Sequence, residues 1–125
     1  MKTEVETISI NGTEYVKKGC EKVPAVKLDG MNYCIVRTYS AGVFAGYVEA
    51  ESENGKQITL RDSRRIWYWD GAASLSQLAN EGVKKPEKCK FAQVVNKCKV
   101  NECIEMIYCT ELARKNIEGV KIWQQ

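Results

Sequence analysis

The chain has 125 residues, of which 44% are apolar and 28% charged, and these values suit a single globular domain over residues 1–125. The net charge of +3, from 19 basic and 16 acidic residues, is too small to favour binding to duplex DNA, which usually draws a strongly basic patch. The chain has no histidine, which excludes the Cys–His and Ser–His pairs of the common hydrolases.

The compartment follows from what the sequence does not contain. No stretch approaches the roughly 18 consecutive apolar residues of a membrane-spanning helix, and MKTEVETISI lacks the apolar run of a signal peptide. We therefore expect a cytoplasmic protein that does not enter a membrane. Its cysteines should be free thiols in that reducing compartment, with no metal site and no cofactor: Cys20, Cys34, Cys89, Cys98, Cys103 and Cys109.

The first predicted element is a β-hairpin within residues 1–22, because two β-prone runs flank Asn11-Gly12, a pair that favours a type I′ turn. A connection that contains Pro24 leads to central strands over residues 32–69. The longer hairpin in that region is predicted to turn at Asn54-Gly55, and Asp62-Ser63 is a candidate bulge in its second arm.

The second half of the chain changes to a helical period. A short helix is predicted over residues 74–82, followed by a strand over 91–100 and a long helix over 101–118, with VKIW as a candidate final strand. The long helix rests on Asn101 as N-cap and on apolar residues at helical spacing: Ile104, Ile107, Tyr108, Leu112 and Ile117. Strands before helices predict an α+β fold, with an antiparallel β-sheet or open barrel core followed by a short helix and one long C-terminal helix.

Two segments combine arginine with aromatic residues. In RTYSAGVFAG, Arg37 offers a planar fork for phosphate, Tyr39 a ring and a hydroxyl, and Gly42 room for close approach. In RDSRRIWYW, strand alternation places Arg65, Trp67 and Trp69 on one face, where indole and guanidinium suit a base and its phosphate. A turn with its usual glycines and a core tryptophan beneath an arginine explain the same residues without any ligand.

A third segment, CKFAQVVNKCKVN, surrounds Phe91 with lysines and ends at Asn101. The N-terminus of a helix that begins at Asn101 would present free amides to an anion. The alternatives are that Phe91 belongs to the core and that Asn101 only caps the predicted helix.

Three stretches together, VRTYSAGVFAGYV, RRIWYWDGAASLSQLANEGVKKPEKCKF and IEMIYCTELARKNIEGVKIW, resemble the first-described type of phage Thoeris anti-defence proteins, over residues 32–123. The resemblance implies a protein that sequesters the cyclic ADP-ribose signal of a bacterial TIR-domain enzyme without degrading it. It also implies a β-sheet core decorated with helices, association into homodimers or larger rings, and a nucleotide pocket between protomers. Some members also hold cyclic oligonucleotides at a separate site.

The resemblance implies a pocket of arginines, a stacking phenylalanine and an asparagine, and no catalytic residues. The ligand-binding residues expected here are Arg37, Tyr39, Gly42, Arg64, Arg65, Phe91, Asn101 and Arg114, with Arg64 and Arg65 as alternatives for one role. Two other functions fit the sequence: a single-stranded nucleic-acid binding module and a nucleotide-processing enzyme.

Overall fold

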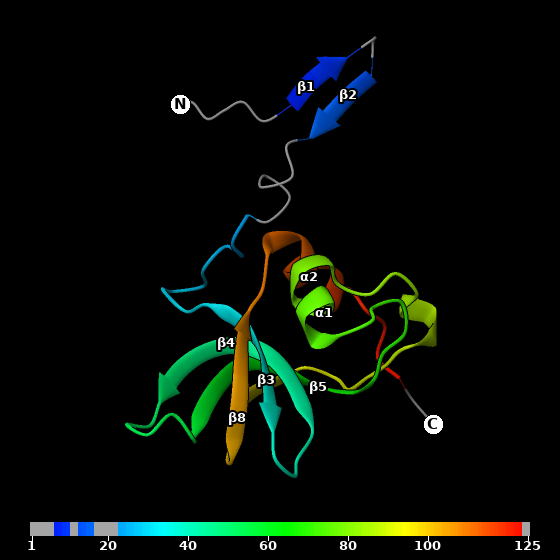
Figure 1. The fold of residues 1–125 in the computed structure, drawn as a ribbon. Helices are drawn as coiled ribbons and strands as arrows, with labels where there is room; N and C mark the ends of the chain where they lie inside the picture. The colour runs from blue at the N-terminus through cyan, green and yellow to red at the C-terminus, as the bar shows by residue number, and fades with distance from the viewer. Residues whose placement is uncertain (1–6, 11–12, 17–22, 124–125) are drawn as a thin grey trace.

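The structure, a computed structural model, describes residues 7–10, 13–16 and 23–123. Strands β1 (Thr7–Ile10) and β2 (Thr13–Val16) pair with each other as a two-stranded antiparallel sheet. The turn predicted at Asn11-Gly12 lies outside the described residues. The fold is α+β, as predicted, with an antiparallel six-stranded sheet and two short helices (Figure 1).

The six-stranded sheet is built mostly from neighbouring hairpins. Its strands are β3 (Tyr33–Thr38), β4 (Val43–Glu51), β5 (Ile58–Tyr68), β6 (Lys90–Phe91), β7 (Val95–Val100) and β8 (Cys103–Tyr108). The order is β6-β5-β4-β3-β8, and β7 also pairs with β5. The single strand predicted over residues 91–100 is therefore two strands, which share one edge of the long β5: β6 lies opposite Ile66 and Tyr68, and β7 lies opposite residues 58–63.

The sheet is strongly curved. Strands β7 and β8 follow each other in the chain but lie on opposite sides of the β5-β4-β3 hairpins, and only Asn101 and Glu102 join them. The Cys103 N–H donates to the Lys56 carbonyl, and the Tyr39 N–H donates to the Glu102 carbonyl, both at 2.9 Å. This short connection is possible only if the sheet curls until its two sides approach each other.

A β-bulge in β5 sets which of its residues face which side. Asp62 has a positive φ of 49°, and the pairing with β4 shifts between Ala45 and Tyr47, which confirms the bulge predicted at Asp62-Ser63. Gly46 lies opposite the bulge, and a Cβ there would lie 2.8 Å from the Ser63 Cβ. Gly46 therefore allows close approach of a neighbouring strand and not of a ligand.

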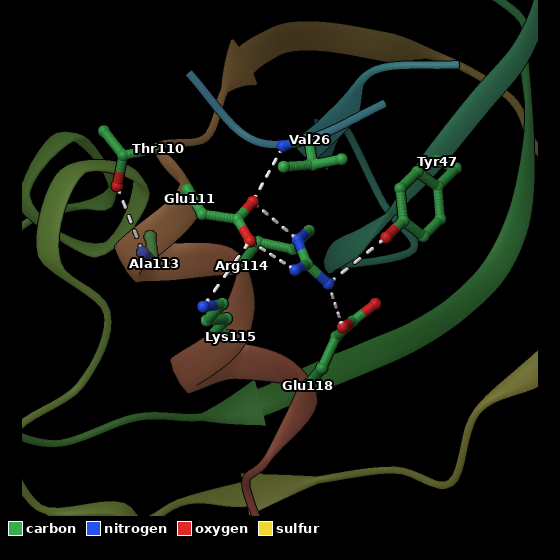
Figure 2. Close-up of polar contacts among 8 residues, drawn as sticks. All are labelled: Val26, Tyr47, Thr110, Glu111, Ala113, Arg114, Lys115 and Glu118. Atoms are coloured by element: carbon green, nitrogen blue, oxygen red, sulfur yellow. Dashed lines mark hydrogen bonds and ion pairs between the residues drawn. The ribbon is translucent and has the colours of Figure 1, made fainter. Parts of the chain in front are cut away.

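The short helix is confirmed as α1 (Leu75–Glu81), which Ser74 caps by accepting from the Gln77 N–H and which ends at Gly82. A 3-10 turn, η2 (Pro86–Lys88), precedes β6. The predicted long helix over residues 101–118 is wrong, because only α2 (Glu111–Glu118) is helical and residues 103–108 form β8. The N-cap is Thr110, whose side-chain oxygen accepts from the Ala113 N–H, and Asn101 caps no helix (Figure 2).

The physical reason for this correction is tertiary pairing. The apolar residues of CIEMIY fit a strand as well as a helix, because the segment is rich in β-branched and aromatic side chains. The edge of β3 offers a continuous ladder, with Cys34 opposite Tyr108 and Val36 opposite Met106. A ladder of backbone hydrogen bonds plus burial of the β8 face outweighs the weak helical preference.

Two apolar clusters pack on the two faces of the sheet. The first lies between the sheet and the helices, which pack together on one side of the sheet (Figure 1), and contains Tyr33, Ile35, Leu78, Phe91 and Ile117 among others. The second contains Val36, Phe44, Ile58, Leu60 and Val100. Ile35 and Val36 are consecutive in β3, so the two clusters lie on opposite faces.

Candidate ligand-binding surface

Arg64 and Arg65 are consecutive in β5 and have opposite environments. Arg64 is only 2% exposed, and its guanidinium carbon lies 5.2 Å from the centroid of the Phe91 ring. Its Nε donates to the Ala92 carbonyl at 2.8 Å, and its Nη1 donates to the carbonyls of Ile117 at 3.0 Å and Val120 at 2.8 Å. Burial lowers the pKa of the Arg64 guanidinium from its usual value. Arg64 therefore holds the end of α2 against the sheet and has no surface to offer a ligand.

Phe91 is buried in the same way as Arg64. Its ring is fully buried in the cluster between the sheet and the helices, directly below the Arg64 guanidinium. The expectation that Phe91 stacks on a ligand is not compatible with this position, because neither face of the ring is accessible.

Arg65 points to the other face of β5 and is exposed. Its guanidinium carbon lies 4.7 Å from the centroid of the Phe44 ring on β4, within the range of a cation–π contact. A cavity of about 210 Å³ opens beside this pair, lined by Phe44, Ser63, Arg65, Trp67, Ala92, Gln93, Val95 and Cys98. The predicted alternation is confirmed for Arg65 and Trp67 by their common cavity. It is wrong for Trp69, which lies beyond the end of β5 and packs against the cluster between the sheet and the helices.

Trp67 continues this surface toward the C-terminal segment. It is 52% exposed, and its ring meets Trp123 edge to face, with ring centroids 5.4 Å apart. The Lys90 Nζ lies 5.0 Å from the centroid of the Trp123 ring. The backbone N–H of Trp123 donates to the Phe91 carbonyl at 2.9 Å, and Ile122 forms a parallel β-bridge with Phe91. The predicted VKIW segment therefore lies beside β6.

We call the group formed by Arg65, Trp67, Lys90 and Trp123, together with the buried Phe44 beneath Arg65, the aromatic–basic surface. A second cavity, of about 630 Å³, adjoins Trp123 and is lined by Pro86, Glu87, Cys89, Lys121, Ile122 and Trp123. Rings and cations lie side by side on this surface, and such a combination is typical of sites that bind the bases and phosphates of nucleotides.

Four other predicted site residues lie around two turns. Arg37 forms an ion pair with Glu105 on β8, with 3.0 Å between Nε and Oε1. Tyr39 is highly exposed in the β3–β4 turn, and Gly42, with φ +99°, accepts hydrogen bonds from Thr38 through its carbonyl. The Asn101 Oδ1 accepts from the Gln57 Nε2 at 2.7 Å. Arg37 thus links β3 to β8, while Tyr39, Gly42 and Asn101 belong to the connections between strands. Only Arg65 of the eight predicted residues belongs to the aromatic–basic surface.

Arg114 is held by acidic partners on its own helix. Figure 2 shows its guanidinium between Glu111 and Glu118, with Nη1 also 3.4 Å from the Tyr47 hydroxyl. Hydrogen bonds from Arg114 and from the Val26 N–H lower the pKa of the Glu111 carboxyl to about 2. Two carboxylates already neutralise Arg114, so a phosphate would have to displace them.

The thiols show no sign of activation. The five described cysteines, Cys34, Cys89, Cys98, Cys103 and Cys109, are free, while Cys20 lies outside the described residues. Burial raises the pKa of Cys34 and of Cys109 to about 12. In the described part of the chain, no three Cys, Asp or Glu side chains gather as a metal site would require.

Sequence reasoning missed Phe44, Lys90 and Trp123 as parts of the candidate surface. Trp67 was visible in the alternation of RDSRRIWYW, but it entered the expected set only through its neighbour Arg65. Phe44 and Trp123 are distant in sequence from β5, and only strand pairing brings them to it.

The molecule is thus an α+β domain with an antiparallel sheet and a surface suited to anionic aromatic ligands. Residues 31–117 match the model of a family described as a domain of unknown function (DUF6948), and the chain belongs to that family. No curated protein and no solved structure matches the chain. Neither helix of the described residues has the length and apolar character needed to cross a membrane.

Proposed function

We propose that this protein binds a nucleotide on its aromatic–basic surface and sequesters it without cleaving it. The ligand is a cyclic ADP-ribose type signal of TIR-based bacterial immunity, as the resemblance to the Thoeris anti-defence proteins implies. In this proposal the protein is phage-encoded and acts in the cytoplasm of the infected host as a homo-oligomer. The observation that carries the proposal is the placement of Arg65 and Trp67 on one face of β5, both exposed and both lining one cavity.

The energies required indicate that the ligand must use the whole surface. A protein that sequesters a signal must compete with the receptor of that signal, which requires tight binding. Nanomolar affinity corresponds to a binding free energy of about 12 kcal/mol. Stacking of one base on Trp67 contributes roughly 1–3 kcal/mol. A charge-assisted hydrogen bond from Arg65 to a phosphate contributes roughly 1.5–3 kcal/mol. Lys90 lies over the Trp123 ring, which in turn contacts Trp67, so both residues are positioned to add further contacts of the same kind.

Cavity size supports a pocket that one protomer does not complete. The cavity beside Arg65 has a volume of about 210 Å³. Pockets that enclose a drug-sized ligand usually measure about 300–1,000 Å³. A base fits into this cavity, and the remaining ribose and phosphate groups would lie on the open surface, within reach of a second protomer.

The chemistry of the side chains supports sequestration over hydrolysis. The chain has no histidine to act as a general base. Burial raises the pKa of Cys89, the one thiol beside the larger cavity, so it is held in its protonated and unreactive form.

A retention experiment tests the proposal. The protein is incubated with a cyclic ADP-ribose isomer, freed of unbound ligand on a desalting column and then denatured by heat. Mass spectrometry of the released material should show the intact isomer in stoichiometric amount. Release of a hydrolysed or linear product would contradict sequestration and indicate an enzyme, and the absence of any retained nucleotide would contradict the ligand class.

Variants locate the site. Arg65→Ala and Trp67→Ala should each weaken the binding of the isomer at least tenfold in calorimetry, because each removes contacts worth at least about 1.4 kcal/mol. Arg61→Ala is the matched control. It changes another arginine of β5, which forms an ion pair with Glu49 and lines neither cavity of the surface. Equal affinities for all three variants would place the ligand elsewhere.

A second candidate, a single-stranded nucleic-acid binding module, is favoured by the exposed lysines before β6 and by Lys121 beside Trp123. Lys84, Lys85 and Lys88 are exposed in the segment before β6, and Lys121 lines the larger cavity. A basic track beside stacking rings suits a single strand. Fluorescence anisotropy with a labelled oligodeoxythymidine separates the two candidates, since a strand bound on this track should dissociate steeply as the salt concentration rises.

A further inference from the structure

The six-stranded sheet has one edge that nothing in the described part of the chain covers or protects. β3 is the only strand that pairs with β8, so the other side of β8 presents backbone groups without a strand partner. Two large apolar side chains lie on this edge strand, Ile104 at 52% exposure and Tyr108 at 58%. We propose that β8 pairs antiparallel with β8 of a second copy of this chain, so that the two sheets continue into each other.

The strands on the other side of the sheet, β6 and β7, are protected from pairing with another chain. The outer side of β6 forms a bridge to Ile122, and the exposed strand β7 carries Lys97 and Lys99. Lysines on an edge strand oppose pairing with another chain. β8 carries no lysine, and its one acidic residue, Glu105, forms an ion pair with Arg37. Of the two exposed edges, only β8 has side chains that tolerate pairing.

The direction of the backbone groups favours this pairing. The Cys109 N–H donates to the Tyr33 carbonyl, across the junction with β3. Because backbone groups alternate in direction along a strand, the amides and carbonyls of Tyr108 and Met106 point away from β3. These are the donors and acceptors that a second copy would meet.

Self-complementarity selects the register. With Met106 opposite its own copy on a two-fold axis, Ile104 lies opposite the partner's Tyr108, which gives an apolar pair at each end. The register with Glu105 opposite its own copy would place two carboxylates face to face, which is destabilising. Ile104 has no residue opposite it on β3, because the pairing shifts between Arg37 and Thr38. The proposed pair therefore uses a residue that the protomer leaves unpaired.

Sedimentation equilibrium at a protein concentration of tens of micromolar tests this interface. It compares replacement of exposed apolar residues by lysine on β8 with the same kind of replacement elsewhere on the surface. The wild-type chain should have the mass of a dimer or of a higher even assembly, and Ile104→Lys/Tyr108→Lys should halve it by placing lysines on the β8 edge. The control is Leu112→Lys, at an apolar residue of α2 that is 56% exposed and lines neither cavity. It should retain the wild-type mass, and circular dichroism should show that all three chains are folded.

A cross-link gives a second readout that does not depend on weakening the assembly. In the proposed register the two Met106 Cα atoms are about 5.5 Å apart, which is the spacing of a hydrogen-bonded antiparallel pair. Disulfides span Cα separations of about 4.4–6.8 Å. Mild oxidation of Met106→Cys in a Cys103→Ser background should therefore give a covalent dimer that the Cys103→Ser chain does not form. The background is needed because the same register places Cys103 opposite Cys109 of the second copy. A monomeric wild-type chain, or a double lysine variant of unchanged mass, would overturn the proposal.

Discussion

The Arg64 guanidinium lies over the Phe91 ring, 5.2 Å from its centroid, and both side chains are buried. From this position Arg64 donates to the carbonyls of Ile117 and Val120 at the end of α2. One buried arginine thus links β5, the ring of β6 and the C-terminal helix. The pair stabilises the fold and does not form a ligand pocket.

Phe91→Ala should destabilise the fold rather than weaken binding alone. Truncation of a fully buried phenylalanine leaves a cavity and typically costs about 3–5 kcal/mol. Urea denaturation followed by fluorescence would measure the loss. Tyr39→Ala, at a highly exposed aromatic residue, should change the free energy of unfolding by less than about 0.5 kcal/mol. A variant Phe91→Ala with wild-type stability and reduced ligand affinity would show that the ring is a binding residue after all.

Gly46→Ala should destabilise the sheet through contact with the bulge. The new Cβ would lie 2.8 Å from the Ser63 Cβ, and overpacking of this kind costs about 1–3 kcal/mol. Ser63→Gly removes that Cβ but leaves the Ser63 Cα 2.9 Å from the new Cβ, so the double variant should recover only part of the stability lost in Gly46→Ala. A double-mutant cycle in urea measures the coupling, and strict additivity would mean that the two residues do not touch.

Glu111 should make stability depend on pH in the acid range. Its pKa is lowered to about 2, mainly by hydrogen bonds from Arg114, so the folded state favours the charged carboxylate. This contribution is fully present above the ordinary carboxyl pKa near 4.5 and is lost as the pH falls toward 2.

The urea midpoints of wild type and Glu111→Gln should therefore differ at about pH 6, with a difference that shrinks below pH 4.5 and vanishes only as the pH falls to about 2. Glu53→Gln, at an exposed glutamate after β4, is the matched control and should follow the wild-type curve. A constant difference between wild type and Glu111→Gln across this range would contradict the shifted pKa.

The thiols should react in an order set by burial. The pKa of Cys34 and of Cys109 is raised to about 12, so neither forms an appreciable thiolate at neutral pH. Iodoacetamide should modify the partly exposed Cys98 in the native protein and reach Cys34 and Cys109 only after denaturation. Peptide mapping by mass spectrometry reads the order directly, and early labelling of Cys34 would contradict the buried position.

The sequence predicted the local elements between residues 32 and 82 well, because turns, hairpins and helix caps carry short-range signals. The β4–β5 hairpin, the bulge at Asp62 and the short helix α1 each follow from a few adjacent residues. The segment 103–108 was assigned to a helix because its apolar spacing fits both periods. Only the free edge of β3, far away in the chain, decides that it is a strand.

The candidate surface was predictable only in part for the same reason. Alternation along β5 correctly grouped Arg65 with Trp67, but it could not show that Arg64, one residue earlier, is covered by α2 and the C-terminal segment. Trp123 reaches the surface through a backbone hydrogen bond to Phe91, a long-range contact that no local pattern encodes.

The connection between β7 and β8 has a consequence for the order in which the sheet is made. Both strands pair with partners that precede them by long stretches of chain, Val100 with Ile58 and Tyr108 with Cys34. During synthesis the β3–β4–β5 meander can assemble first, but neither of its sides is completed until the last quarter of the chain has left the ribosome. Non-local strand pairing loses the entropy of closing long loops before it gains the free energy of the new contacts. This final step should therefore limit the folding rate.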